Sequence, residues 1–165
     1  MTIFAPENYQ PSKKIISPLM TIYGAVGVGK STFASTFPKP FFFDFEGRTS
    51  HIKNIVRDAD YNIDTPNLQN WGQLINAVKE LGETDFKTII FDGITKFQDF
   101  VWEEVAKQLN DLKHPDPRTI PYGVGYARAR ELFAGLMFAA KELQRKHNKI
   151  IIFIDHEKVK EEDPL

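Results

Sequence analysis

A glycine-rich segment near the start of the sequence has the residue types and the spacing that bind phosphate. Residues 24–31 read Gly-Ala-Val-Gly-Val-Gly-Lys-Ser and fit the pattern G-x-x-x-x-G-K-[ST] in full. Glycines let the backbone curl around a phosphate, Lys30 would bridge the β- and γ-phosphates, and Ser31 would offer its hydroxyl to Mg²⁺. The segment predicts a site for a nucleoside triphosphate, with ATP favoured. Its expected lining is Gly24, Ala25, Val26, Gly27, Val28, Gly29, Lys30, Ser31 and Thr32.

A carboxylate that follows an apolar run is the second candidate for nucleotide chemistry. Lys87–Phe91 is mostly apolar, and Asp92 comes directly after it. In α/β nucleotide-binding proteins, such a run is a buried strand that brings one acid to the sheet edge beside Mg²⁺. Strands that end in aspartate are common, so this pattern alone is a weak indication. It becomes significant because the same chain contains the phosphate-binding segment. Together the two segments predict Ser31 and Asp92 as magnesium ligands.

Glu46 is the candidate general base. The aromatic run Phe41–Phe45 contains Asp44 and is followed by Glu46 and Gly47. Because the side chains of a strand alternate between its faces, either Asp44 or Glu46 can point toward the nucleotide. We expect Glu46 to orient and deprotonate the water that attacks the γ-phosphate; a solvated turn acid is the alternative.

His156 is the candidate residue at a further strand end. The apolar run Ile150–Ile154 is followed by Asp155 and His156, again at the predicted carboxyl edge of the sheet. We expect His156 to contact the γ-phosphate and report its hydrolysis; an exposed histidine beside the acidic tail is the alternative. The other histidines, His51, His114 and His147, lack metal-ligand spacing, and the chain has no cysteine. Disulfides and thiolate metal sites are therefore excluded.

Composition limits the remaining function classes. The 165 residues are 42% apolar, enough for one good core, and 21 basic residues nearly balance 22 acidic ones. The net charge is therefore too small to indicate binding to nucleic acid or membranes. The longest apolar runs are too short to span a bilayer, and the N-terminal sequence lacks the apolar core of a signal peptide. These features predict a soluble cytoplasmic protein.

The chain alternates between candidate strands and candidate helices. Strands are expected over 15–23, 41–45, 86–91 and 149–154. Helices are expected over 30–37, over 71–81 with Asn70 as N-cap, along the stripe Phe97, Val101, Val105 and Leu109, and over 127–147. Residues 113–127 carry three prolines and two glycines and predict a long loop.

This alternation predicts an α/β fold, a three-layer sandwich with a mostly parallel sheet covered on both faces. We expect a flexible arm over residues 1–14 and one P-loop domain over 15–165. Only the charged stretch 157–165 follows the fourth strand, so the sheet is expected to lack a last strand, either because the domain is truncated at its C-terminus or because it is an unusually short version of the fold. An open edge of this kind would invite a partner.

The order of the motifs resembles the ATPase core of RecA-like proteins. The resemblance is nearest to short phage-encoded AAA-type or RecA-like ATPases that accompany single-strand annealing and recombination genes. It is carried by Ile22–Thr32, Phe41–Arg48, Ile89–Thr95 and Ile151–Lys158. It implies Mg²⁺-dependent ATP hydrolysis with Lys30, Glu46 and His156 in catalytic roles. RecA itself has glutamine where this chain has His156.

The resemblance also implies partners. It places single-stranded DNA against the segment that follows the helix after Asp92. Basic and aromatic side chains suit that ligand, because cations follow phosphates and aromatic rings stack on bases. Here its candidate contacts are Lys113, Arg118, Tyr122, Tyr126, Arg128 and Arg130; an ordinary surface loop is the alternative. Proteins of this kind work as filaments or rings, in the host cytoplasm, beside other recombination or single-strand-binding proteins. Arg128 and Arg130 are candidates for a residue that completes a neighbour's ATP site.

Two other classes share the phosphate-binding segment. A small-molecule or nucleotide kinase combines a P-loop with a parallel sheet, and only the region Arg118–Arg130 could then serve as its arginine-rich lid. A non-catalytic adaptor would bind ATP and a protein partner without turnover. No Asn/Thr-Lys-x-Asp segment is present, which disfavours GTP.

Overall fold

The computed structural model describes residues 17–45, 47, 49, 52 and 71–157. Two predictions fall outside these residues: the N-terminal arm over 1–14 and the position of Glu46. The N-cap proposed for the second helix, Asn70, also lies outside them.

A four-stranded sheet forms the centre of the fold. Its strands are β1 (Leu19–Gly24), β2 (Pro40–Asp44), β3 (Thr88–Asp92) and β4 (Ile150–His156). They run in the order β1-β4-β3-β2, and every neighbouring pair is parallel. The carboxyl ends of all four strands therefore meet at one edge of the sheet, where open α/β sheets bind their ligands.

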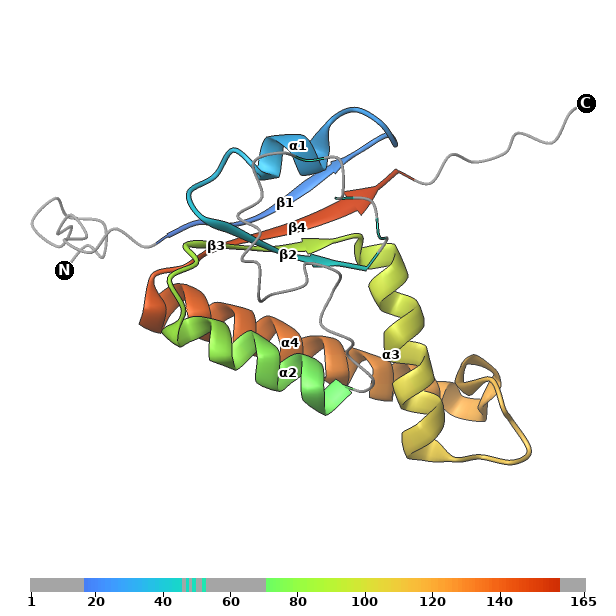
Figure 1. Cartoon of the computed structure of the whole chain (residues 1–165). Coiled ribbons are helices and arrows are strands. Elements are labelled where there is room, and N and C mark those ends of the chain that lie inside the picture. Colours follow the sequence, from blue (N-terminus) through green and yellow to red (C-terminus); the bar gives the residue numbers. More distant parts are fainter. Residues whose placement is uncertain (1–16, 46, 48, 50–51, 53–70, 158–165) are drawn as a thin grey trace, which may run out of the picture.

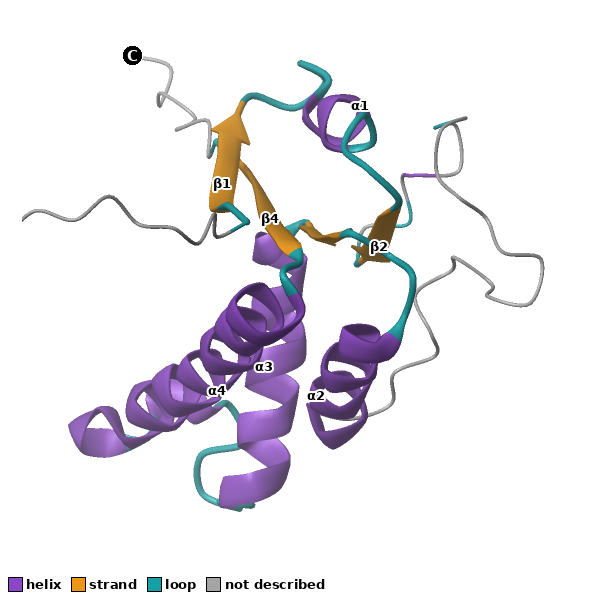
Figure 2. Cartoon of the chain, turned by 90° about the vertical axis from the view of Figure 1, so that its left-hand side faces the viewer, coloured by secondary structure: helices purple, strands orange, loops and turns teal. Residues whose placement is uncertain are grey.

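Helices cover the sheet on both faces. The short helix α1 (Lys30–Ala34) lies on one face, and α2 (Trp71–Glu80), α3 (Ile94–Leu109) and α4 (Val124–His147) lie on the other (Figures 1 and 2). The α/β three-layer prediction is confirmed. In the described part of the chain, no helix is long and apolar enough to cross a membrane.

Alternation along the strands sorts the side chains into two cores. On β3, Ile89 and Phe91 belong to the larger core under α2, α3 and α4, whereas Ile90 belongs to the smaller core beside α1. The phenylalanines of β2 alternate in the same way: Phe41 and Phe43 belong to the larger core, where the ring of Phe43 stacks on Phe91, and Phe42 belongs to the smaller one. Since successive side chains point to opposite faces, Asp92 lies on the α1 side.

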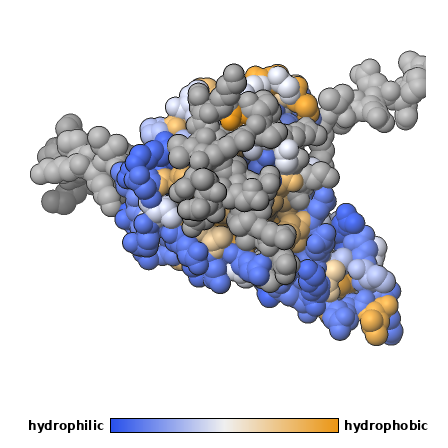
Figure 3. Space-filling model, viewed as in Figure 1, coloured by the Kyte–Doolittle hydropathy of each residue, from blue (hydrophilic) through white to orange (hydrophobic). Residues whose placement is uncertain are grey.

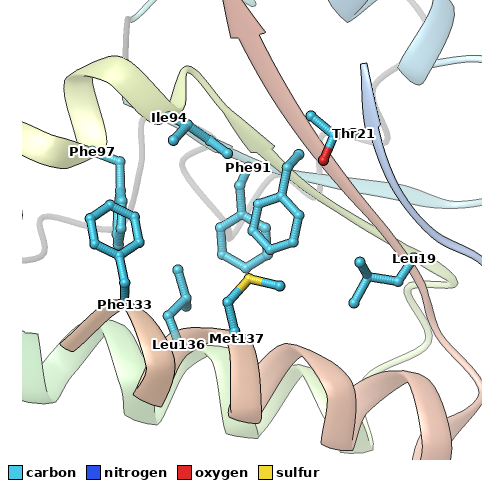
Figure 4. Close-up of a pocket in the computed structure, with 9 residues that line it drawn as sticks. Leu19, Thr21, Phe91, Ile94, Phe97, Phe133, Leu136 and Met137 are labelled. Carbon is cyan, nitrogen blue, oxygen red and sulfur yellow. The ribbon is translucent and has the colours of Figure 1, made fainter. Parts of the chain in front are cut away.

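A small apolar cavity lies on the other face. Its volume is about 130 Å³, and it is lined by Phe91, Ile94, Phe133, Met137 and five further residues (Figure 4). Thr21 is the one polar residue of its lining. The cavity therefore lies on the opposite side of the sheet from the phosphate-binding segment and lacks its chemistry.

Two element predictions differ from the structure. Helix α1 ends at Ala34, because Ser35 and Thr36 turn their hydroxyls onto the carbonyls of the preceding turn. The predicted loop over 113–127 is largely wrong: it contains 3-10 helices at Pro117–Thr119 and Pro121–Gly123, and α4 already begins at Val124. Prolines at the first position of each short helix are tolerated, because the missing N–H is unpaired there anyway.

Candidate functional site

The phosphate-binding segment connects β1 to α1 at the carboxyl edge of the sheet. β1 ends at Gly24 and α1 begins at Lys30. Gly27 and Gly29 have φ values of 82° and 88°, a conformation that other residues adopt only with strain. A Cβ at either position would meet no atom within 4 Å. The backbone angle, not crowding, is therefore the reason for glycine at these two positions.

The side chain of Lys30 turns back toward the start of this segment. It is buried, and its Nζ donates to the carbonyl oxygens of Gly24 at 2.9 Å and Ala25 at 2.7 Å. The same atom lies 3.0 Å from His156 Nδ1. Because an ammonium group only donates, this contact is a hydrogen bond when Nδ1 is the unprotonated ring nitrogen. The structure thus brings together two of the predicted catalytic residues.

Ser31 and Asp92, the two predicted magnesium ligands, are also brought together. The Ser31 hydroxyl donates to Asp92 Oδ2 at 2.5 Å, and Asp92 is buried at the end of β3. Mg²⁺ prefers oxygen ligands and takes one or two carboxylates together with substrate phosphates. A hydroxyl and a carboxylate beside a phosphate loop fit that preference, so these residues are chemically suited to hold the ion.

The sequence matches the model of a known family over most of its length. Residues 17–164 match the family described as AAA domain. The chain belongs to the AAA domain family. A comparison with curated proteins found no match. Membership indicates an AAA-type nucleotide-binding domain with ATP-binding and hydrolysing activity, and the matched region includes all four strands.

At the end of β2 the AAA domain holds a buried acid. Asp44 Oδ2 accepts hydrogen bonds from the backbone N and the hydroxyl of Thr49, both at 2.8 Å. Asp44 therefore holds Thr49 close to the end of β2. Glu46, the predicted base, comes between them in the sequence but lies outside the described residues. Sequence reasoning missed Thr49, since nothing in the local pattern marks it.

A second polar link joins the end of β4 to α3. The Thr95 hydroxyl donates to Asp155 Oδ1 at 3.0 Å. Thr95 lies in the first turn of α3, three residues after Asp92. The sequence marked Asp155 only as the first member of a polar pair, and the link to Thr95 was not predicted. The available signal was the position of Thr95, a polar residue only three positions after Asp92.

The predicted DNA contacts gather at the far end of the AAA domain, where α3 ends and α4 begins (Figure 1). Arg118 is engaged there: its Nε donates to Asp116 Oδ1 at 2.9 Å, and its guanidinium lies 5.7 Å from the ring centre of Trp102. The bond lowers the pKa of Asp116 and raises that of Arg118. Arg128 is engaged as well, with Gln108 at 2.7 Å and Glu131 at 2.5 Å.

The other predicted contacts at this end face solvent. Lys113, Tyr122 and Arg130 are exposed, Tyr126 is 57% exposed, and the Tyr126 ring packs edge-on against Trp102. Figure 3 shows hydrophobic surface at the same end of the molecule. Gly125 allows the start of α4 to pack closely against Pro117, because a Cβ there would lie 2.0 Å from the carbonyl oxygen of Pro117. These residues therefore lie at the end of the domain that is remote from the phosphate loop.

Proposed function

We propose that this AAA domain hydrolyses Mg²⁺·ATP and that the ATP cycle controls its binding of single-stranded DNA during phage recombination or repair. The observation that carries the hydrolysis is the meeting of three chain segments at one sheet edge: the phosphate loop, the end of β3 and the end of β4. Lys30 lies against His156, and Ser31 lies against Asp92. The nature of the DNA and the phage setting rest on the sequence resemblance.

Each residue has a distinct role in this proposal. Lys30 exchanges its carbonyl partners for the β- and γ-phosphates, and the loop backbone surrounds the phosphates. Ser31 and Asp92 would hold Mg²⁺, which would neutralise charge on the phosphates. Glu46 accepts a proton from the attacking water while the bond from the γ-phosphorus to the β-γ bridging oxygen breaks, which releases ADP and phosphate.

His156 links the nucleotide to the rest of the sheet. Its Nδ1 accepts from Lys30 in the structure, so any movement of Lys30 toward a phosphate alters the hydrogen bond of the histidine. His156 lies at the end of β4, where it pairs with Gly24 of β1, and β4 also pairs with β3 along its earlier residues. It is thus placed to sense the γ-phosphate through Lys30 and to pass the change on to neighbouring elements.

The surface that we propose for DNA is formed by Lys113, Tyr122 and Arg130. All three are exposed, whereas Arg118 and Arg128 are ion-paired. A cation can follow the phosphates of a single strand, and a free tyrosine ring can stack on a base. Helix α3 begins beside Asp92 and ends at this surface, so it connects the two proposed sites.

A paired substitution tests the DNA surface. Exchange of Lys113 and Arg130 for alanine should weaken binding of single-stranded DNA about tenfold and reduce the salt slope of log K by about 1.4, because each phosphate that a cation neutralises accounts for about 0.7 of that slope. Fluorescence anisotropy with a labelled oligonucleotide at several salt concentrations measures both. The matched control exchanges two exposed lysines on α2 and α4, Lys79 and Lys141, for alanine. Equal losses of affinity in both variants would exclude this surface.

We further propose that copies of the domain assemble as a filament or a ring, as the resemblance implies. Val26, Val28 and Phe33 are more than half exposed beside the phosphate loop. A neighbouring subunit that covered them would remove apolar surface from water. Sedimentation with and without ATP tests assembly, and a stable monomer in both states would contradict it.

A further inference from the structure

Two adjacent residues at the end of β4 face opposite layers of the fold. Successive side chains of a strand point to opposite sides of the sheet. Asp155 faces α3, where Thr95 donates to it, and His156 faces the phosphate loop, where it contacts Lys30. The end of β4 therefore connects the layer of α3 to the layer of the P-loop.

A single carboxylate oxygen makes this connection. Asp155 Oδ1 accepts from the Thr95 hydroxyl at 3.0 Å and from the backbone N of His156 at 2.9 Å. Thr95 belongs to the first turn of α3, which starts two residues after Asp92. The same oxygen therefore fixes the backbone from which His156 projects and the start of the helix that follows the proposed magnesium ligand.

We infer that Thr95 and Asp155 are positioning residues for ATP hydrolysis, which act by holding His156 against Lys30 in a fixed relation to Asp92. The inference rests on the proposed function and names the residues that position one part of its site. Asp155 points to the opposite face from the phosphate loop. Loss of its bond to Thr95 therefore changes the rate of hydrolysis and leaves the affinity for ATP unchanged.

Substitution at Thr95 separates these two quantities. Thr95→Val removes the hydroxyl at nearly constant volume and is expected to lower kcat about tenfold, because small displacements of a catalytic group are costly. The Kd for a fluorescent ATP analogue should stay within about twofold of the unaltered protein. Thr95→Ser keeps the hydroxyl and should restore kcat. Thr84→Val is the matched control, since Thr84 is also half-buried and donates to a carbonyl, that of Leu81 at 2.8 Å.

A double substitution asks whether Thr95 acts through His156. If it does, Thr95→Val should cause no further loss of kcat in a His156→Ala protein, because the group that it positions is already absent. Independent losses that multiply in the double variant would overturn the inference. So would an unchanged kcat in Thr95→Val, or a failure of Thr95→Ser to restore it.

A measurement without turnover distinguishes this inference from the proposed function. The NMR resonances of the His156 ring, assigned by their loss in His156→Ala, should move in Thr95→Val and stay in place in Thr84→Val and Thr95→Ser. If the unaltered protein released no phosphate, the proposed function would fail, and this result would still decide whether Thr95 positions His156. Unmoved resonances in Thr95→Val would overturn the inference.

Discussion

Exchange of Asp92 for asparagine should lower kcat/KM for Mg²⁺·ATP by about 100-fold or more, the cost of losing a group that stabilises charge in the transition state. Asparagine keeps an oxygen that can accept from Ser31, so the short contact between β3 and α1 persists. The negative charge that we propose as the metal ligand is lost. The concentration of Mg²⁺ needed for half-maximal activity should therefore rise, which a magnesium titration at saturating ATP would measure.

Two serine substitutions complete this test: Ser31→Ala removes the other proposed ligand, and Ser35→Ala is the matched control. Ser31→Ala should also raise the concentration of Mg²⁺ needed for half-maximal activity, because it removes the second proposed ligand. Ser35→Ala should leave it unchanged: Ser35 is also buried beside α1, but its hydroxyl donates to the carbonyl of Thr32. A magnesium requirement that was the same in Asp92→Asn as in the unaltered protein would exclude Asp92 as a ligand.

Exchange of Glu46 for glutamine should abolish hydrolysis and preserve ATP binding. A general base contributes about 100- to 10,000-fold to a rate, and glutamine removes the base while keeping the size of the side chain. Single-turnover phosphate release should fall by that factor, whereas the Kd for ATP should stay within about twofold.

Glu157→Gln serves as the control for Glu46, because Glu157 is an exposed acid at the same sheet edge whose backbone N donates to the carbonyl of Gly24. Its substitution should leave the rate unchanged. If Glu46→Gln hydrolysed ATP at the normal rate, another acid would have to activate the water. A protein that functions normally without hydrolysis would instead be the nucleotide-gated adaptor.

The local parts of the site could be predicted from the sequence because local patterns specify them. A P-loop is one continuous segment, so its glycines, Lys30 and Ser31 are visible in eight residues. Alternating apolar runs and helical stripes indicated the α/β fold in the same way. The position of Asp92 followed from where an apolar run ends, and the structure brings it to Ser31.

The long-range parts could not be predicted, because they depend on how the strands are ordered. Lys30 and His156 are 126 residues apart, and they meet because β4 pairs directly with β1. The bond between Thr95 and Asp155 depends in turn on β3 lying on the other side of β4. No periodicity within one segment contains that information.

The region before α4 shows how composition can mislead. Three prolines and two glycines indicated a loop over 113–127, yet Pro117 and Pro121 begin short helices. Gly125 packs so closely against the carbonyl of Pro117 that a Cβ would not fit there. The polar residues chosen there as DNA contacts include Arg118 and Arg128, whose ion pairs with Asp116 and Glu131 only the folded structure reveals.

Phosphate release from Mg²⁺·ATP by the unaltered protein, compared with Lys30→Ala prepared in the same way, tests the central claim most directly. Circular dichroism should first establish that Lys30→Ala is folded, since Lys30 is buried and donates to two carbonyls. Release well above that of Lys30→Ala is the result expected for hydrolysis at this site. Equal release from the two folded proteins would contradict it.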